Sequence, residues 1–512
     1  MESKKKIFSL GVISSYSTLI VGFIINLISI PLGLRYFGLV QFGILTVIYS
    51  IISYLNLSRL GINSAAITLI AKSGEKEEQY SIIKRSFILQ FITVLFLILT
   101  LFLLGHFFPQ WVNLVGKYPQ NLFNEVSKAV NIIFLSFLIC LPLDIFNSAF
   151  IGFQKLYIDR IVVIFRGLME LFSLIIVVLL KWDLVSLALI RGVGLIIINI
   201  MSFFYFLKLN PQFLKRTSIS ISDKSNYKLL FNSSIKFFFI SIFSLIIWNT
   251  DNLVISNILG ADKVAPYAVT FKFYSIIYAF ILYINTPLAP LYGKAIAENN
   301  WNWIKENYER FNLMMFIIAG AIWIFGMSFA EQIIKIWAGP EAFGGFLILF
   351  SIGGWMFILS YCSVNSTLLT GLNLTGFLTL ILGIESIINI IISIFLVKRI
   401  GIGGASLGTF IAALIVSSWS LPLIVKKQTD NKVVINYKIL LKNLFLIILP
   451  FLILPILSNY FIKNNIIKYS LLIINFFSYL LLSWFILPKK IKSYLIEQIN
   501  ISKNKLFKRE LK

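Results

Sequence analysis

Residues 157–180 read YIDRIVVIFRGLMELFSLIIVVLL, an almost unbroken run of apolar side chains. An α-helix needs about 20 consecutive apolar residues to cross roughly 30 Å of hydrocarbon, so this stretch predicts a membrane-spanning helix. Beyond Asp159 and Arg160 near its start, it contains two residues of opposite charge, Arg166 and Glu170, which lie four positions apart and therefore share one helix face. The stretch thus indicates both the class of fold and a place where charge enters the membrane.

Thirteen further apolar runs of similar length occur along the chain. Fourteen spans occupy more than half of the 512 residues, and the connections between them are too short for a catalytic domain. The sequence therefore predicts an all-α polytopic membrane protein with about 14 transmembrane helices. The predicted spans are residues 10–34, 38–57, 85–108, 129–153, 157–180, 184–208, 237–259, 264–289, 311–330, 343–371, 375–397, 402–425, 443–462 and 466–487.

The composition agrees with a protein that lies in a bilayer. Hydrophobic residues make up 58% of the chain and charged residues 13%, with a mean hydropathy of +0.90, whereas soluble chains average about 25% charged residues. This excludes a soluble globular enzyme. The net charge of +24 comes from basic residues between the apolar runs. There they contact lipid headgroups and set the orientation of the chain rather than bind nucleic acid.

The distribution of Lys and Arg predicts that orientation. If the N-terminus is cytoplasmic, the loops and the tail on its side carry 31 basic residues and the opposite side about 10. Cytoplasmic loops are enriched in Lys and Arg, so both termini are expected in the cytoplasm and the chain in the cytoplasmic membrane of a bacterium or another prokaryote. The tail from Lys489 onward either lies on the anionic leaflet or is a solvated basic segment.

A weak internal repeat with a period near 220 residues divides the chain. Gly38 and Gly260 follow the first span of each half, and FIGFQK from Phe150 matches LTGLNL from Leu369 at the end of the fourth. Six helices is an even number, so the halves insert in the same orientation and form two pseudo-symmetric lobes. The expected parts are an N-terminal six-helix lobe (1–215), a C-terminal six-helix lobe (216–430), helices 13 and 14 (431–488) and a basic cytoplasmic tail (489–512).

Eight ionisable residues lie inside the predicted spans or at breaks in them. A charge at a helix centre costs about 2.5–3.5 kcal/mol on insertion scales, so each needs a water-filled pathway or a buried partner. Arg166 and Glu170 could neutralise each other. Arg191 and Lys272 have no carboxylate one turn away, which favours a functional role. The eight residues are Arg59, Asp144, Arg166, Glu170, Arg191, Asp251, Lys272 and Glu385.

For three of these charged residues, the neighbouring sequence indicates the local environment. Arg59 lies in LSRLGINS, where Gly61 predicts a broken helix that dips toward the interior. Asp251 belongs to the polar stretch NTDN. Asp144 follows Pro142, which leaves a helix carbonyl unpaired, so Asp144 either faces a pathway or satisfies that kink.

Several kinds of chemistry have no support in the sequence. The single His106 has no neighbouring ligand cluster, and Cys140 and Cys362 lie within apolar runs, so neither a metal site nor a disulfide is expected. The chain has neither a Walker loop nor a dinucleotide-binding glycine pattern. No cofactor and no catalytic residue is therefore predicted.

Two segments carry a resemblance to a known family. They are PLGLRYFGLVQFGILTV from Pro31 and NTDNLVISNILGADKVAPYAVTFKFYS from Asn249. With the fourteen helices and the basic loops, they resemble the polysaccharide-transport branch, which includes the Wzx-type flippases, of the multidrug/oligosaccharidyl-lipid/polysaccharide exporter superfamily. The resemblance covers roughly residues 5–488. It implies two lobes around a cationic cavity that turns an undecaprenyl-diphosphate-linked oligosaccharide, such as an O-antigen or capsule repeat unit, toward the outer leaflet.

Several roles follow as implications of this resemblance. The cationic cavity carries over onto Arg59, Arg191 and Lys272, and less directly onto Arg166. The residues themselves, with no nucleotide site and with carboxylates inside the predicted spans, indicate coupling to protons or sodium, for which the candidates are Asp144, Glu170, Asp251 and Glu385. The expected partners are the lipid-linked oligosaccharide, membrane lipids and other glycan-assembly proteins. The chain departs from the similar peptidoglycan-precursor flippases because it has no charge between Lys6 and Arg35, which disfavours lipid II as substrate.

Three alternatives remain open at the level of sequence. A multidrug antiporter of the same superfamily favours an acidic cavity and usually has twelve helices. A membrane glycosyltransferase or glycan polymerase needs a sizeable outer loop with carboxylates. A membrane scaffold requires that all eight membrane charges pair off and leave no hydrated cavity.

Overall fold

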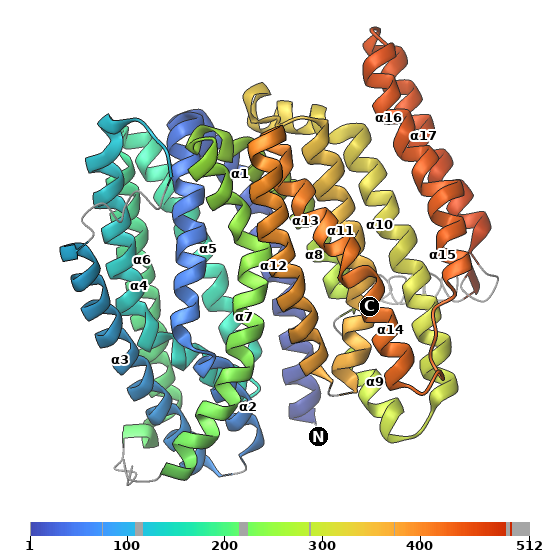
Figure 1. Ribbon diagram of the computed structural model, residues 1–512. Helices are drawn as coiled ribbons and strands as arrows, with labels where there is room; N and C mark the ends of the chain where they lie inside the picture. Colours follow the sequence, from blue (N-terminus) through green and yellow to red (C-terminus); the bar gives the residue numbers. More distant parts are fainter. Residues whose placement is uncertain are drawn as a thin grey trace, which may run out of the picture. The chain divides into compact units, whose positions relative to one another are not determined.

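The computed structural model describes residues 2–73, 75–107, 116–214, 224–285, 288–372, 374–487 and 492–493. Within these ranges the chain forms helices and short connections and contains no strand, so the all-α prediction is confirmed (Figure 1). Twelve helices in the described part are long and apolar enough to cross a membrane. The predicted basic tail, residues 489–512, lies almost entirely outside the described residues.

The fourteen predicted spans all coincide with helices. The count of twelve arises because α1 (Glu2–Leu55) contains two predicted spans and because α8 (Val264–Asn285) is not among the twelve. Gly38 interrupts α1 with φ 68° and ψ 179°, a conformation that favours glycine, at the turn where the sequence separates the first two spans. Two shorter helices are not predicted as spans: α2 (Ile62–Lys72) lies between two spans, and α9 (Leu288–Ala297) begins at the end of the span 264–289 and continues beyond it.

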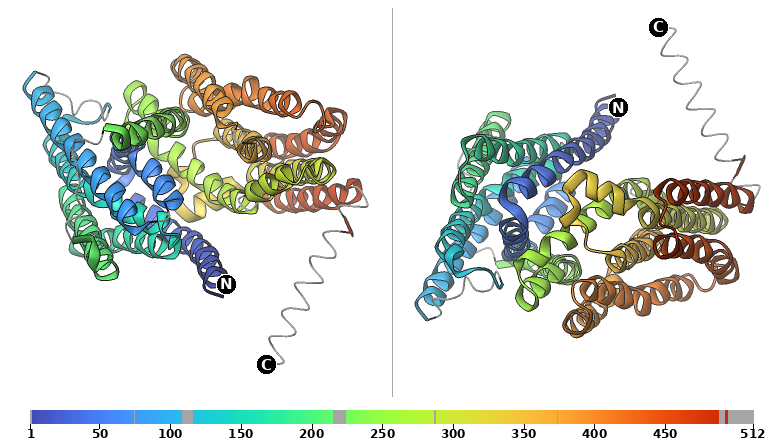
Figure 2. Two further views of the ribbon diagram at one scale, coloured as in Figure 1. Left: turned by 90° about the horizontal axis from the view of Figure 1, so that it is seen from below. Right: turned by 90° about the horizontal axis from the view of Figure 1, so that it is seen from above.

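The remaining helices follow the order of the predicted spans. They are α3 (Lys76–Phe107), α4 (Phe123–Gly152), α5 (Leu156–Leu180), α6 (Leu184–Leu209), α7 (Lys224–Ile258), α10 (Trp301–Ala338), α11 (Phe346–Gly371), α12 (Thr375–Ile400), α13 (Gly403–Ile415), α14 (Ser417–Gln428), α15 (Tyr437–Asn443), α16 (Leu449–Phe461) and α17 (Asn465–Ile486). Figure 2 shows the helices from their two ends.

The chain divides into two compact units. The first comprises Met1–Val269, Ile334–Phe343 and Ser386–Gly408, and the second comprises Thr270–Ile333, Gly344–Glu385 and Thr409–Lys512. The lobes expected from the sequence, with boundaries at residues 215 and 430, stay a prediction.

In the first unit, α4 is the central helix. It packs against α6, α2 and α3, and α1 packs against α5. One end of α4 contributes Phe146 and Phe150 to an aromatic core, where Phe146 lies 5.1 Å from Phe206 of α6 between ring centroids. Burial of such large rings is among the strongest stabilising contributions available to a helix. This packing fixes the faces that α4, α5 and α6 turn toward one another.

The end of α1 is broken as the sequence predicts. A short 3₁₀ turn, η1 (Asn56–Arg59), follows α1, and Leu60 and Gly61 then adopt left-handed conformations before α2 begins. The side-chain amide of Gln90 donates to the carbonyl of Arg59 at 3.2 Å, which satisfies a backbone acceptor freed by the break. The break places the Arg59 side chain beside α4.

The second unit has an aromatic interior. α11 is buried over most of its length, and Trp355 in its middle is 1% exposed. Trp323 of α10 lies 6.0 Å from Phe410 of α13 between ring centroids. Gly354 admits this packing, because a Cβ atom there would lie 2.7 Å from the Phe410 ring.

Candidate functional site

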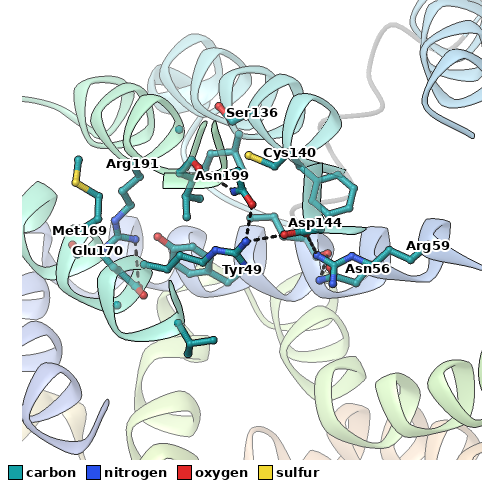
Figure 3. A pocket seen from close by; sticks show the side chains of 18 residues that line it. Tyr49, Asn56, Arg59, Ser136, Cys140, Asp144, Met169, Glu170, Arg191 and Asn199 are labelled. Carbon is teal, nitrogen blue, oxygen red and sulfur yellow. Dashed lines mark hydrogen bonds and ion pairs between the residues drawn. The ribbon is translucent and has the colours of Figure 1, made fainter. Parts of the chain in front are cut away.

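A cavity of about 440 Å³ lies within the first unit, between α1, η1, α4, α5 and α6 (Figure 3). Its wall is mostly apolar, but five charged side chains reach it from four different elements. These charged residues are Arg59, Asp144, Arg166, Glu170 and Arg191. The structure thus brings together five of the eight membrane charges that the sequence singles out.

Asp144 lies between two arginines. Its Oδ2 accepts a hydrogen bond from Nη2 of Arg59, and its Oδ1 accepts one from Nη2 of Arg166 at 2.6 Å. The Asp144 side chain is 8% exposed, whereas those of Arg59 and Arg166 are 31% and 27% exposed. The carboxylate therefore lies deeper than the guanidinium groups that neutralise it, and the two arginines are the part of this cluster that a ligand can reach.

Three neutral residues complete the cluster. Asn199 of α6 accepts a hydrogen bond from Nη2 of Arg166 at 2.6 Å. The amide of Asn147 lies 3.4 Å from Oδ1 of Asp144, and its Oδ1 accepts a 2.6 Å hydrogen bond from Ser202. Sequence reasoning missed these residues because neutral polar groups cost little on insertion. Their signal is the helical spacing: Asn147 follows Asp144 by three positions, and Ser202 follows Asn199 by three.

Arg191 is held at a second point of the cavity wall. Its Nη1 lies 3.6 Å from Oε1 of Glu170, and its Nε donates to Oγ of Ser173 at 3.0 Å. The guanidinium also stacks over the ring of Tyr49, 5.2 Å from the centroid. Figure 3 shows the dashed line between Arg191 and Glu170, away from the Asp144 cluster.

Arg166 and Glu170, which the sequence allows to pair along α5, each have an ion-pair partner on another helix instead. Although the two residues share one helix face, each finds a partner on another helix, Asp144 on α4 and Arg191 on α6. Cross-helix pairs form because α4 and α6 pack closely and α5 packs against both. Arg191, which lacks a carboxylate in its own helix, consequently has one across the interface.

Two guanidinium nitrogens around the cavity, Nε of Arg59 and Nε of Arg166, are buried and have no hydrogen-bond partner among the residues that the structure describes. Nη1 of Arg191 has only the 3.6 Å ion pair with Glu170 and no hydrogen bond within the same residues. The cavity also has three arginines against two carboxylates, an excess of one positive charge. Both observations indicate a site for an anion with several oxygen acceptors.

The other three predicted residues lie elsewhere. Asp251 of α7 is buried in the first unit and accepts a 2.7 Å hydrogen bond from the hydroxyl of Tyr267. Its neighbour Thr250 lies 2.5 Å from the hydroxyl of Tyr54, so this polar stretch joins α7 to α1. Lys272 of α8 is half-buried in the second unit and is not among the residues that line the cavity.

Glu385 is the most isolated of the predicted carboxylates. It lies on α12 in the second unit, is 2% exposed and accepts a hydrogen bond from Oγ of Ser417. Within the described ranges no Lys or Arg lies within ion-pair distance of it. The four carboxylates thus divide into Asp144 and Glu170 in the cavity, and Asp251 and Glu385 outside it.

Comparison with known families gives two matches. The family described as polysaccharide biosynthesis protein matches residues 9–296, more than half of the chain, and the MatE family matches residues 237–395. A candidate O-antigen transporter of Salmonella typhimurium is 26% identical over 210 residues, which are 40% of this chain and 47% of that protein. The chain thus spans about half the length of this relative. The uncharacterised membrane protein EpsK of Bacillus subtilis is 22% identical over 78% of this chain and 80% of its own length.

Solved structures show the same fold. The lipid II flippase MurJ in an inward closed conformation matches with a TM-score of 0.66 and 17% identity, over 93% of this chain and 97% of that chain. An inward-facing multidrug resistance transporter of the MATE family matches with a TM-score of 0.66 and 14% identity, over 82% and 98%. These comparisons confirm the family resemblance that the sequence carries, and the relatives and solved structures that have a named role are transporters or flippases. The chain belongs to the polysaccharide biosynthesis protein family and has the fold of the multidrug/oligosaccharidyl-lipid/polysaccharide exporter superfamily.

Proposed function

We propose that the protein is a flippase for an undecaprenyl-diphosphate-linked oligosaccharide, such as an O-antigen or capsule repeat unit. It moves this lipid from the inner to the outer leaflet of a bacterial cytoplasmic membrane by alternating access, with both termini in the cytoplasm. The observation that carries the proposal is the excess of guanidinium groups over carboxylates around one membrane cavity, where Nε of Arg59 and Nε of Arg166 have no partner among the described residues. The relatives named as O-antigen transporters support the glycan part of the substrate.

A diphosphate is the part of such a substrate that most needs this cavity. Moving it out of water removes its hydration shell, which is costly unless charged hydrogen bonds replace it. Arginine replaces them well, because its planar fork can hold two phosphate oxygens at once. Arg59, Arg166 and Arg191 surround a cavity of about 440 Å³, the size of sites that hold small ligands. The sugars and the lipid tail need not enter it.

The membrane potential can drive this movement. A diphosphate of about two negative charges gains roughly 4.6 kcal/mol per 100 mV when it moves outward across an inside-negative membrane. Glu385 adds a means of coupling to a proton or sodium gradient, since it is buried, has a hydroxyl partner and has no Lys or Arg at ion-pair distance among the described residues. A Glu385→Gln variant should therefore lose the response of transport to pH gradients and retain its response to potential.

Multidrug antiport is the second candidate, because the MatE family matches residues 237–395 and several structural neighbours are MATE transporters. A pump for organic cations favours an acidic cavity. The cavity in the first unit instead has a positive excess and unsatisfied donors. Anion transport is therefore the better-supported function.

The test uses purified full-length protein in proteoliposomes that contain lipid-linked oligosaccharide. Outward flipping is measured for the wild type and for Arg166→Ala and Arg191→Ala. Both variants should flip at less than a tenth of the wild-type rate, because each removes donors from the cavity. Arg399→Ala removes the same charge from the exposed end of α12 and should flip normally. Normal flipping by both cavity variants, or transport of organic cations in place of the lipid, would refute the proposal.

A further inference from the structure

We propose that Asp144 is the resident counter-ion of the cavity. In the empty protein its carboxylate occupies the place on Arg59 and Arg166 that a substrate phosphate takes in the loaded protein. This inference rests on the proposed function, because it requires the cavity to bind a phosphate. It gives Asp144 a positioning role in substrate exchange, distinct from the contacts of the arginines with the substrate.

The hydrogen bonds of Asp144 show why a phosphate can replace it. Each arginine gives Asp144 a single nitrogen, Nη2, while the Nε of both Arg59 and Arg166 has no partner among the described residues. A guanidinium group binds phosphate best through two parallel N–H bonds. One carboxylate shared by two guanidinium groups cannot provide this. A diphosphate has enough oxygens to bind both forks and so gains hydrogen bonds that Asp144 leaves unmade.

Charge makes the two occupants mutually exclusive. With Asp144 on its arginines, the charged residues of the cavity sum to one positive charge. A diphosphate brings about two negative charges onto the same guanidinium groups. Its oxygens would then lie within a few ångström of the Asp144 carboxylate, and like charges at that distance repel strongly in a buried site. Asp144 must therefore leave Arg59 and Arg166 when the phosphate arrives.

The structure of α4 allows Asp144 to leave the two arginines, and its departure changes the polar links of this helix. Pro142, two residues before Asp144, removes a helix N–H and permits α4 to bend at this point. Asp144 ties α4 to η1 and α5, whereas Asn147 ties it to α6 through Ser202. Release of the carboxylate breaks the polar links from α4 to η1 and α5 and keeps the polar link to α6, while α4 still packs against α2, α3 and α6. Substrate binding thus changes which helices α4 moves with.

The first test measures the binding of inorganic pyrophosphate to full-length protein in nanodiscs by titration calorimetry. Asp144→Asn removes the competing charge and keeps the side-chain shape, so it should bind pyrophosphate at least tenfold more tightly than the wild type. Asp430→Asn is the matched control. It removes the same charge at an exposed position whose φ of 49° suits asparagine, and it should bind as the wild type does.

A second variant keeps the proposal testable if Asp144→Asn does not fold. Asn199→Asp places another carboxylate on Nη2 of Arg166, where Asn199 now accepts a 2.6 Å hydrogen bond. It should bind pyrophosphate at least tenfold more weakly. If Asp144 only holds the arginines in place, Asp144→Asn binds pyrophosphate more weakly than the wild type. Unchanged binding by Asn199→Asp would show that a carboxylate on Arg166 does not compete with the anion, which would overturn the proposal.

The flipping assay also distinguishes a counter-ion role of Asp144 from a merely structural role. In the flipping assay, Asp144→Asn should lower KM and also lower turnover, because the substrate binds without a counter-ion to help expel it. A merely structural residue would raise KM. If the wild type binds pyrophosphate, Arg166→Ala abolishes binding and Asp144→Asn binds no more tightly than the wild type, the counter-ion proposal fails and the proposed function stands. If the wild type binds no pyrophosphate, both fail.

Discussion

Helices α4 to α6 and helices α11 to α14 have the same spacing along the chain and very different interiors. Gly152 and Gly371 end α4 and α11, and Leu156 and Thr375 begin α5 and α12; each pair is 219 residues apart. α6 and α13 also begin 219 residues apart. The helix ends therefore repeat with one period, which agrees with the weak repeat in the sequence.

The side chains at matching positions differ in kind. Arg166 corresponds to Glu385, Arg191 to Phe410 and Ser136 to Trp355. The first set lines a polar cavity, whereas Trp355 and Phe410 belong to a packed aromatic interior. One pattern of helix ends thus accommodates a polar cavity in the first unit and dense aromatic packing in the second. The repeat fixes where the helices begin and end, but not what lies between them.

The largest effect is expected when position 166 receives the acidic residue of the matching position 385. In Arg166→Glu, the new carboxylate faces Asp144, and the cavity loses its positive excess. We expect flipping to fall to the rate of empty liposomes and pyrophosphate binding to weaken more than 100-fold. Rates are measured per folded molecule, with Arg399→Glu as the exposed control. More than a tenth of wild-type flipping would show that the cavity charge is dispensable.

Trp355→Ala tests the other side of the comparison. It removes the largest fully buried side chain of the aromatic interior, and such changes cost about 3–5 kcal/mol in the free energy of unfolding. Thermal unfolding in detergent should show this loss, with a smaller one for Trp355→Phe. Pyrophosphate affinity per folded molecule should not change. A large change in affinity would mean that the aromatic interior contributes to the anion site.

Arg191→Lys sharpens the account of the cavity. It keeps the positive charge but loses the planar fork, the hydrogen bond from Nε to Ser173 and the stacking on Tyr49. We expect about tenfold weaker pyrophosphate binding, in contrast to the greater loss in Arg191→Ala. Calorimetry measures both. If Arg191→Lys lost as much affinity as Arg191→Ala, the positive charge at this position would contribute nothing to pyrophosphate binding.

The smallest expected effect lies at the start of α6. Oδ1 of Asp183 accepts hydrogen bonds from the backbone N–H and the hydroxyl of Ser186, and the side-chain hydrogen bond of Ser186 lowers the pKa of Asp183. The matching residue before α13, Ile402, cannot cap a helix in this way. Asp183→Ala should lower the free energy of unfolding by about 1 kcal/mol at neutral pH, as loss of a helix cap does.

The pH dependence of this effect has a defined sign. The pKa of Asp183 is lower in the folded protein, so its contribution is complete above the unfolded pKa of about 3.9 and is lost as the pH falls through the folded value. Thermal unfolding of the wild type and Asp183→Ala should therefore differ at pH 7 and converge in acid. A difference that persists in strong acid would exclude capping as its cause.

Much of the fold could be predicted from the sequence, because apolar length alone defines membrane helices. All fourteen spans coincide with helices, and the breaks at Gly38 and after Arg59 lie where glycine indicated them. The pairing of charges could not be predicted in the same way. Arg166 and Glu170 share a face of α5, but which helix covers that face depends on packing. Asn147 and Asn199 were missed for the related reason that neutral side chains carry no large insertion cost.

The roles of the candidate residues stay predictions. The structure places Arg59, Arg166 and Arg191 around one cavity and leaves Lys272 and Glu385 outside it. Sequence reasoning could identify each charge as costly in a membrane but could not decide which of them share a cavity. That depends on the faces that α4, α5 and α6 turn toward one another.

The order of the cavity charges along the chain has a consequence for biogenesis. The partners of Arg166 are Asp144, which precedes it, and Asn199, which follows within the next helix. Arg191 likewise finds Glu170 one helix earlier. Protein segments fold as they leave the ribosome, N-terminal parts first. When Arg166 or Arg191 enters the bilayer, a carboxylate partner has therefore already been synthesised. All residues of this charged network are therefore synthesised before the first residue of the second unit, Thr270.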